Sequence, residues 1–249
     1  MTSPIRLLIT GIEGRMGQAI ATCTREDSRF QINGAIGTQN SDSFSDTLKK
    51  CDVTIDFTEP AATLSFVEIS AQENKPIVIG TTGHSEATRA AITQCSQKIP
   101  IVLAPNFSVG INTLFWLSRK TAEILGPEFD LEIVEMHHRH KKDAPSGTAC
   151  RLAEILAEVR SLSVAHQVRH GRQGIIGERP VAEIGMHALR GGDVVGDHTV
   201  LFSGDGERVE LSHKASNRTT FARGSLRAAA WILKQPPGLY DMQDVLSLR

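Results

Sequence analysis

The sequence has few cysteines, almost no net charge and no long hydrophobic run. Its four cysteines form no Cys-x-x-Cys pair, which is typical of reduced thiols in the cytoplasm and not of a disulfide framework. Lys and Arg number 27 against 28 Asp and Glu, so no basic excess points to nucleic acid or an anionic membrane. No apolar run approaches the ~20 residues of a membrane helix, and no signal peptide is recognisable. We therefore expect a soluble cytoplasmic protein that binds neither nucleic acid nor a membrane.

The first hundred residues alternate short apolar runs with amphipathic stretches. This alternation predicts an α/β fold with a Rossmann-like, doubly wound parallel sheet covered on both faces. Thr58-Glu59-Pro60 predicts a helix start, with Thr58 as the cap and Pro60 in the first turn. The expected strands are Ile5–Thr10, Phe30–Ile36, Cys51–Phe57, Pro76–Gly80 and Ile99–Ala104, with helices at Gln18–Thr24, Ala61–Gln72 and Ser85–Gln97.

The pattern changes after about residue 108 and indicates a second α+β domain. Helices are expected at Val109–Leu125, Ser146–Val159 and Thr219–Lys234, with a strand at Leu131–Met136. Between Val181 and Lys214, strand-like runs alternate with Gly-rich turns at Gly191–Asp193, Gly196–Asp197 and Gly204–Gly206, which predicts an antiparallel or mixed sheet. We expect a dinucleotide-binding domain at 1–108 and 219–249 and a domain for substrate binding and oligomerisation at 109–218. Hinges would lie near Phe107–Val109 and Arg218–Phe221.

A glycine-rich segment lies at the first strand-to-helix junction. Gly11-Ile12-Glu13-Gly14-Arg15-Met16-Gly17 has the glycines that let a backbone turn tightly against a pyrophosphate at a helix N-terminus. In many such sites an acidic residue at the end of the second strand holds the ribose hydroxyls. Here that position is occupied by Gly37-Thr38, so the acidic residue is absent. The choice between NADH and NADPH stays open, since Arg15 could meet a 2′-phosphate or simply face solvent.

Residues 132–149 combine histidines, lysines and a helix start. His137, His138 and His140 lie close to Lys141, and Pro145-Ser146-Gly147-Thr148 leads into a helix. Imidazoles exchange protons near neutral pH, and amides at a helix N-terminus bind carboxylates. We interpret the segment as an anion pocket beside a proton donor. A metal site on the three histidines is the alternative, but adjacent histidines on a strand point to opposite faces.

The run from Glu135 to Ala149 resembles the signature of the dihydrodipicolinate reductases, also called 4-hydroxy-tetrahydrodipicolinate reductases, of diaminopimelate and lysine biosynthesis. The resemblance spans nearly the whole chain. Its supporting motifs are Gly11–Gly17, Asp56-Phe57-Thr58, Gly80–Gly83, Ala104–Ser108, His213–Arg218 and Phe221-Ala222.

The resemblance implies an enzyme that uses NADPH or NADH, needs no metal and forms a homotetramer. It would reduce a cyclic dicarboxylate, with His137 as proton donor and Lys141 as second acid, both catalytic. His138, Ser146, Gly147 and Thr148 would bind the substrate. The residues implied in cofactor binding are Gly11, Ile12, Glu13, Gly14, Arg15, Met16, Gly80, Thr81, Thr82, Ala104, Pro105, Asn106 and Phe107.

Three departures from the family pattern are local. Gly37 and Thr38 stand where the family often has an acidic residue and Arg, Glu13 where a small residue is common, and Pro105 where Ala is frequent. We expect the Glu13 side chain to point away from the pyrophosphate. Two rival functions are a different NAD(P)-dependent imine or amino-acid dehydrogenase and a non-catalytic dinucleotide sensor, which would not need His137, Lys141 and Ser146–Thr148 together.

Overall fold

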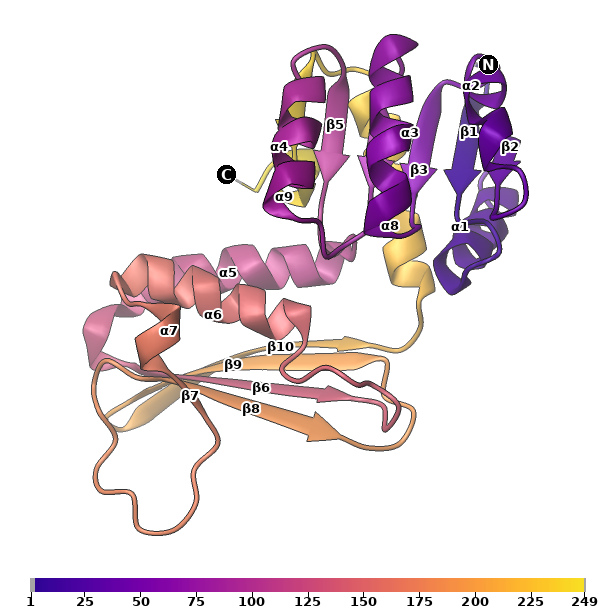
Figure 1. The fold of residues 1–249 in the computed structure, drawn as a ribbon. Helices are drawn as coiled ribbons and strands as arrows, with labels where there is room; N and C mark the ends of the chain where they lie inside the picture. Colours follow the sequence, from indigo (N-terminus) through magenta and orange to yellow (C-terminus); the bar gives the residue numbers. More distant parts are fainter. Residues whose placement is uncertain (1–2, 249) are drawn as a thin grey trace. The chain divides into compact units, whose positions relative to one another are not determined.

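A computed structural model describes residues 3–248. The chain divides into two compact units, Met1–Val109 with Arg218–Arg249, and Gly110–Asn217. The helix that follows the second unit therefore returns the chain to the first (Figure 1).

The first unit is built on a six-stranded sheet in which every neighbouring pair of strands is parallel. The strand order is β11-β5-β4-β3-β1-β2. Because the chain moves from β1 to one side for β2 and to the other for β3, the carboxyl end of β1 is the point where ligands bind in such sheets. The strands are β1 (Ile5–Thr10), β2 (Phe30–Ile36), β3 (Val53–Asp56), β4 (Ile77–Ile79), β5 (Pro100–Leu103) and β11 (Gly238–Tyr240).

Helices cover both faces of this sheet because its central strands are apolar on both sides. Along β1, Leu7 and Ile9 pack into one core with α1 (Arg15–Arg25), α8 (Thr219–Ile232) and α9 (Met242–Leu246). Leu8, between them, packs into the opposite core. That second core holds α2 (Phe44–Leu48), α3 (Pro60–Gln72) and α4 (Glu86–Cys95), with the short turn η1 (Ser41–Ser43) preceding α2.

The second unit has a five-stranded mixed sheet in the order β10-β9-β6-β8-β7. Strand β6 pairs parallel with β8 and antiparallel with β9. The strands are β6 (Asp130–His137), β7 (Val168–His170), β8 (Ile184–Arg190), β9 (Gly196–Gly204) and β10 (Glu207–Ala215). The helical segments are α5 (Val109–Leu125), η2 (Gly126–Glu128), α6 (Gly147–Arg160) and α7 (Val164–Gln167).

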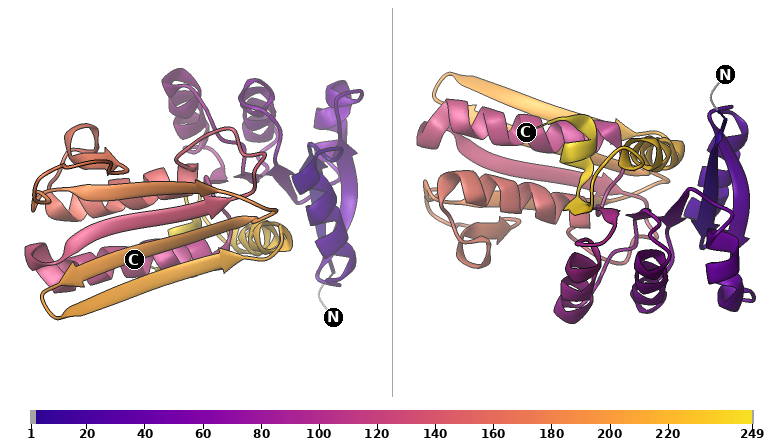
Figure 2. Two further views of the ribbon diagram at one scale, coloured as in Figure 1. Left: turned by 90° about the horizontal axis from the view of Figure 1, so that it is seen from below. Right: turned by 90° about the horizontal axis from the view of Figure 1, so that it is seen from above.

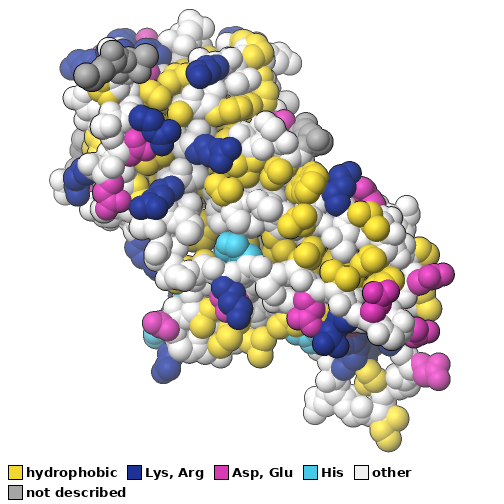
Figure 3. All heavy atoms as spheres, turned by 180° about the vertical axis from the view of Figure 1, so that it is seen from behind, with side chains coloured by type: hydrophobic (Ala, Val, Ile, Leu, Met, Phe, Trp, Pro, Cys, Tyr) yellow, Lys and Arg dark blue, Asp and Glu magenta, His cyan; other side chains and the backbone are white. Residues whose placement is uncertain are grey.

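The core of the second unit lies on one face of its sheet. Side chains of α5 and α6 pack there against alternate residues of β6, β8 and β9. In the view from below, the strands lie in front of these helices and no described helix covers them from that side (Figure 2). The loop between β7 and β8 projects from this unit (Figure 1), and hydrophobic side chains are visible on the projecting part in the view from behind (Figure 3). Ile175 in this loop is fully exposed.

The structure confirms the fold class, and helix α5 begins and ends where the sequence predicts. Two local predictions are wrong. The cap of α3 is Glu59 and makes no side-chain cap hydrogen bond; the Thr58 hydroxyl donates instead to Asp56, a stronger acceptor, at 2.6 Å. Gly196–Asp197 begins strand β9 and is not a turn. Strands β7 and β11, three residues each, were not expected.

Within residues 3–248, no helix combines the length and apolar character needed to cross a membrane. The cysteines Cys23, Cys51, Cys95 and Cys150 are all free.

Candidate functional site

The glycines after β1 form a turn that other residues cannot adopt. Gly11 has a φ of +73°, and a Cβ there would lie 2.5 Å from the Phe57 carbonyl oxygen. A Cβ on Gly17 would lie 2.2 Å from the Gly11 carbonyl oxygen. The cap of α1 is Gly14, which offers no side chain to the first amides of the helix. The close backbone approach and the uncapped N-terminus together fit a pyrophosphate.

A cavity of about 490 Å³ opens beside this turn. Of the residues predicted to bind the cofactor, Gly11, Glu13 and Gly14 line it. Its other walls come from the end of β2, from η1 and from the start of α3: Ile36, Gly37, Thr38, Ser41, Phe57, Thr58, Glu59, Ala62 and Phe66.

A buried carboxylate ties together the ends of neighbouring strands. Asp56, at the end of β3, is fully buried and accepts hydrogen bonds from four threonine hydroxyls. The donors are Thr10 at 2.6 Å, Thr58 at 2.6 Å, Thr63 at 2.6 Å and Thr81 at 3.0 Å. Thr81 is one of the predicted cofactor residues. Its hydroxyl donates to Asp56 and accepts from the Thr58 amide at 2.9 Å.

The remaining predicted cofactor residues lie at the ends of β4 and β5. A Cβ on Gly80 would lie 2.2 Å from the Phe57 ring, so this glycine allows the ring to pack closely. Ala104 and Phe107 are buried in the core, which leaves the Phe107 side chain unable to face a ligand without moving. Asn106 accepts from the Ser108 amide at 2.9 Å and shapes the loop.

In the second unit, the predicted proton donor His137 is held by a carboxylate. His137 is 9% exposed at the end of β6, and its Nδ1 lies 2.6 Å from Glu135 Oε2. Glu135 is 1% exposed and also accepts from the Arg190 guanidinium and the Ser146 amide. Burial would raise the pKa of Glu135, but the hydrogen bonds from Arg190, His137 and Ser146 outweigh it and hold that pKa below its usual range.

The other ring nitrogen of His137 faces a glycine. A Cβ on Gly196 would lie 2.9 Å from His137 Nε2. Because the Nδ1 side is occupied by Glu135, Nε2 is the atom that can exchange a proton with a ligand. The absence of a side chain at Gly196 keeps that nitrogen accessible.

A second histidine, His198, supports the start of α6. Its Nε2 lies 3.1 Å from the Ser146 hydroxyl, which in turn accepts from the Ala149 amide and caps the helix. Burial, reinforced by the nearby His137, lowers the pKa of His198 to about 3. His198 is therefore neutral at physiological pH, although its ring centroid lies 5.2 Å from that of His137.

The predicted substrate residues surround the helix start. The Ser146 hydroxyl is buried and engaged in capping, whereas Gly147 has open space where a Cβ would stand. Thr148 follows in the first turn of α6. The Lys141 ammonium pairs with Asp143 at 2.9 Å, and the Asp143 side chain is largely exposed, so this pair is weak. The structure thus brings His137 and the α6 N-terminus together through Glu135.

The three sequence-adjacent histidines do not converge. His138 donates its amide to the Val194 carbonyl at 2.7 Å, and its ring lies 6.2 Å from that of His140, between centroids. Among the described residues, no group of three or more His, Cys, Asp or Glu side chains could hold a metal ion.

Four residues of these sites receive no role from the sequence: Asp56, Glu135, Arg190 and His198. Glu135 could have been found, because it precedes His137 by two residues and therefore shares its face of the strand. Arg190 stands opposite His137 only through the pairing of β6 with β8, and that register is not readable from the sequence.

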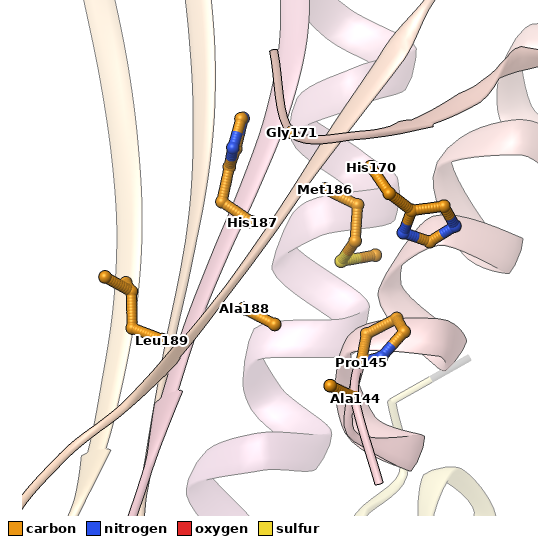
Figure 4. A pocket seen from close by; sticks show the side chains of 8 residues that line it. All are labelled: Ala144, Pro145, His170, Gly171, Met186, His187, Ala188 and Leu189. Atoms are coloured by element: carbon orange, nitrogen blue, oxygen red, sulfur yellow. The ribbon is translucent and has the colours of Figure 1, made fainter. Parts of the chain in front are cut away.

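A second cavity of about 490 Å³ lies at the edge of the second sheet. His170, Met186 and Pro145 project around it (Figure 4). None of the predicted site residues lines this cavity.

The parallel sheet with a glycine turn at its switch point and the carboxylate-held imidazole of the second unit define a class: a two-domain, dinucleotide-dependent oxidoreductase. The family profile for the N-terminus of dihydrodipicolinate reductase matches residues 5–107, and that for its C-terminus matches residues 110–246. The chain belongs to the dihydrodipicolinate reductase family.

Individual relatives support the same family assignment. The 4-hydroxy-tetrahydrodipicolinate reductase of Akkermansia muciniphila is 54% identical over 244 residues, covering 98% of each chain. That of Geobacter sulfurreducens is 45% identical over 264 residues, covering 98% of this chain and 99% of its own. A dipicolinate-bound dihydrodipicolinate reductase from Paenisporosarcina sp. has a TM-score of 0.79 at 26% identity, covering 97% of this chain and 98% of its own. The chain is accordingly an NAD(P)H-dependent reductase of diaminopimelate and lysine biosynthesis.

Proposed function

We propose that the chain reduces 4-hydroxy-tetrahydrodipicolinate to tetrahydrodipicolinate, with residues 1–108 and 219–249 binding NADPH or NADH and residues 109–218 binding the substrate. The observation that carries this proposal is the buried Glu135–His137 pair beside the N-terminus of α6. A proton donor next to a carboxylate-binding helix end suits a ring that carries two carboxylates and must be protonated.

His137 is the proposed proton donor. Glu135 accepts from Nδ1 and stabilises the positive charge of the protonated ring, so the proton to be delivered sits on Nε2. Gly196 leaves that atom uncovered. When bound, the reduced nicotinamide supplies the hydride; the residues of the chain position the ring and deliver the proton.

Two positive sites are proposed to hold the substrate carboxylates. Gly147 and Thr148 lie in the first turn of α6, where the helix dipole favours an anion. Lys141 would exchange its weak pair with Asp143 for a substrate carboxylate and would assist proton delivery. His138 and Ser146 flank this pocket. The Ser146 amide donates to Glu135 and the Ser146 hydroxyl caps the helix, so Ser146 positions the helix start.

The proposed cofactor site is the glycine turn with the loops after β4 and β5. Ile12, Arg15 and Met16 would contact the pyrophosphate and adenosine with Gly11, Glu13 and Gly14. The nicotinamide would lie along Gly80, Thr81 and Thr82 and along the segment from Ala104 through Pro105 and Asn106 to Phe107.

The test is a steady-state assay that follows the loss of reduced-nicotinamide absorbance. The substrate is made in place from pyruvate and aspartate semialdehyde by the preceding synthase, with NADH and NADPH in parallel. Oxidation that requires the synthase supports the proposal. A folded protein that binds dinucleotide but oxidises neither cofactor would favour a different imine substrate or a sensor.

We also propose a cytoplasmic homotetramer. One face of the second sheet carries no described helix, and Ile175 and Val181 on the β7–β8 loop are strongly exposed, as an interface would require. Arg172 and Arg179 of this loop donate hydrogen bonds to the Glu132 carboxylate on that face. The free cysteines accord with a reducing compartment.

The oligomer is tested by light scattering of the full chain and of Ile175→Asp. A tetramer that dissociates in Ile175→Asp but persists in Ile124→Asp, a control at an exposed residue of α5, supports the interface. A native monomer, or equal dissociation of both variants, would contradict it.

A further inference from the structure

We propose that Glu13 takes the place of the acidic residue missing from the end of β2, and that it makes the enzyme prefer NADH over NADPH. This inference rests on the proposed function, because it concerns the adenosine end of the same cofactor site.

The Glu13 carboxylate lies beside the residues that follow β2. Its Oε2 accepts from the Thr38 hydroxyl at 3.1 Å and lies 3.4 Å from the Thr38 amide nitrogen. Thr38 lies two residues beyond Ile36, where β2 ends. The side chain of the glycine turn therefore reaches across to the end of the second strand.

The Glu13 carboxylate fills the space where a side chain on Gly37 would begin. A Cβ built on Gly37 would lie 2.4 Å from Glu13 Oε1 and 3.2 Å from Oε2. A side chain at the end of β2, which in dinucleotide-binding sheets usually supplies the carboxylate for the ribose hydroxyls, would start in that space. Gly37 leaves it free, and Glu13 occupies it from the other side.

Glu13 also lines the proposed cofactor cavity. Glu13, Gly37 and Thr38 line the same cavity as Gly11 and Gly14 of the pyrophosphate turn. A ribose next to the pyrophosphate therefore meets the Glu13 carboxylate, which accepts hydrogen bonds from its hydroxyls.

The charged side chains that line the cavity are acidic. The residues that line it, all within the described part of the chain, include the carboxylates of Glu13 and Glu59 and no Lys or Arg. The 2′-phosphate of NADPH carries a charge of about −1.5 to −2 at neutral pH. It would meet like charge with no lining cation to offset it, whereas the ribose hydroxyl of NADH gains an acceptor.

Calorimetric titration of the full-length protein with NADH and with NADPH tests this, because the two differ only in the 2′-phosphate. We expect the native protein to bind NADH at least about tenfold more tightly. In Glu13→Gln the NADH dissociation constant should rise about tenfold, as for loss of a charge-assisted hydrogen bond, while that of NADPH falls. Glu68→Gln, which removes an exposed carboxylate on α3 outside the cavity, should keep the native ratio.

A double variant tests the location of the charge. Glu13→Ala with Gly37→Glu moves the carboxylate to the end of β2 and should restore the preference for NADH that Glu13→Ala alone loses. An unchanged ratio of dissociation constants in Glu13→Gln, or equal native affinities for both cofactors, overturns the inference and leaves the proposed function standing. Failure of the native protein to bind either dinucleotide overturns both.

Discussion

The neutral state of His198 makes a quantitative prediction about stability. Its pKa is about 3 in the folded protein against 6.5 for an ordinary histidine, because the ring is buried and lies near His137. Between these two pH values this histidine is protonated in the unfolded chain but not in the folded protein. The free energy of unfolding therefore keeps the full contribution of His198 above about pH 6.5 and decreases as the pH falls below it. Linkage gives a loss of about 2 kcal/mol between pH 7.5 and pH 5, and roughly 4 kcal/mol by pH 3.

The assay is urea denaturation of the native protein and of His198→Gln at pH 7.5 and pH 5, with free energies of unfolding extrapolated to water. Gln cannot titrate, so the variant should lose about 2 kcal/mol less than the native protein over this interval, whatever its stability at pH 7.5. His166→Gln, at an exposed histidine of α7, is the matched control and should keep the native pH dependence. Equal losses in His198→Gln and the native protein would refute the reasoning.

Four further predictions concern the catalytic arrangement. His137→Gln should lower kcat by about 10²–10⁴-fold with an unchanged dinucleotide dissociation constant, and near-native turnover would exclude His137 as the proton donor. Glu135→Gln should lower both kcat and, by about 2–4 kcal/mol, the free energy of unfolding measured in urea, because Arg190 and other buried donors lose acceptors; unchanged stability would contradict this. Lys141→Ala should raise KM and lower kcat, whereas a change confined to the thermal midpoint would remove its carboxylate role. Gly196→Ala should slow turnover by covering His137 Nε2 without changing dinucleotide affinity, and native kcat would show that this nitrogen is not the donor.

Much of the fold could be predicted from local sequence patterns. Gly126-Pro127 stops the apolar periodicity of α5, and the predicted helix Val109–Leu125 matches the structure at both ends. Strands of three residues, such as β7 and β11, escape notice because they are too short for a period to emerge. The predicted cap at Thr58 is wrong because cap preferences consider only neighbouring residues. The Thr58 hydroxyl donates to Asp56, which also accepts from threonines of β1, α3 and the loop after β4.

The candidate site could likewise be predicted only in part. The histidines, Lys141 and the start of α6 are contiguous in sequence, so their grouping could be predicted. The partners of Glu135 could not, since Arg190 reaches it only because β8 lies beside β6 in one register. Likewise, Glu13 and Thr38 are 25 positions apart in the sequence, and they meet because β2 lies beside β1 with Ile36 opposite Thr10.

The Asp56 cluster has a consequence for hydrogen-bond direction. Each threonine hydroxyl has a single proton, and those of Thr10, Thr58 and Thr81 are donated inward to the carboxylate. Thr58 also lines the cofactor cavity, so its oxygen can present only lone pairs to that space. A ligand group that hydrogen-bonds to Thr58 must therefore be a donor. A ribose hydroxyl or an amide N–H can donate to Thr58, whereas an unprotonated phosphate oxygen cannot.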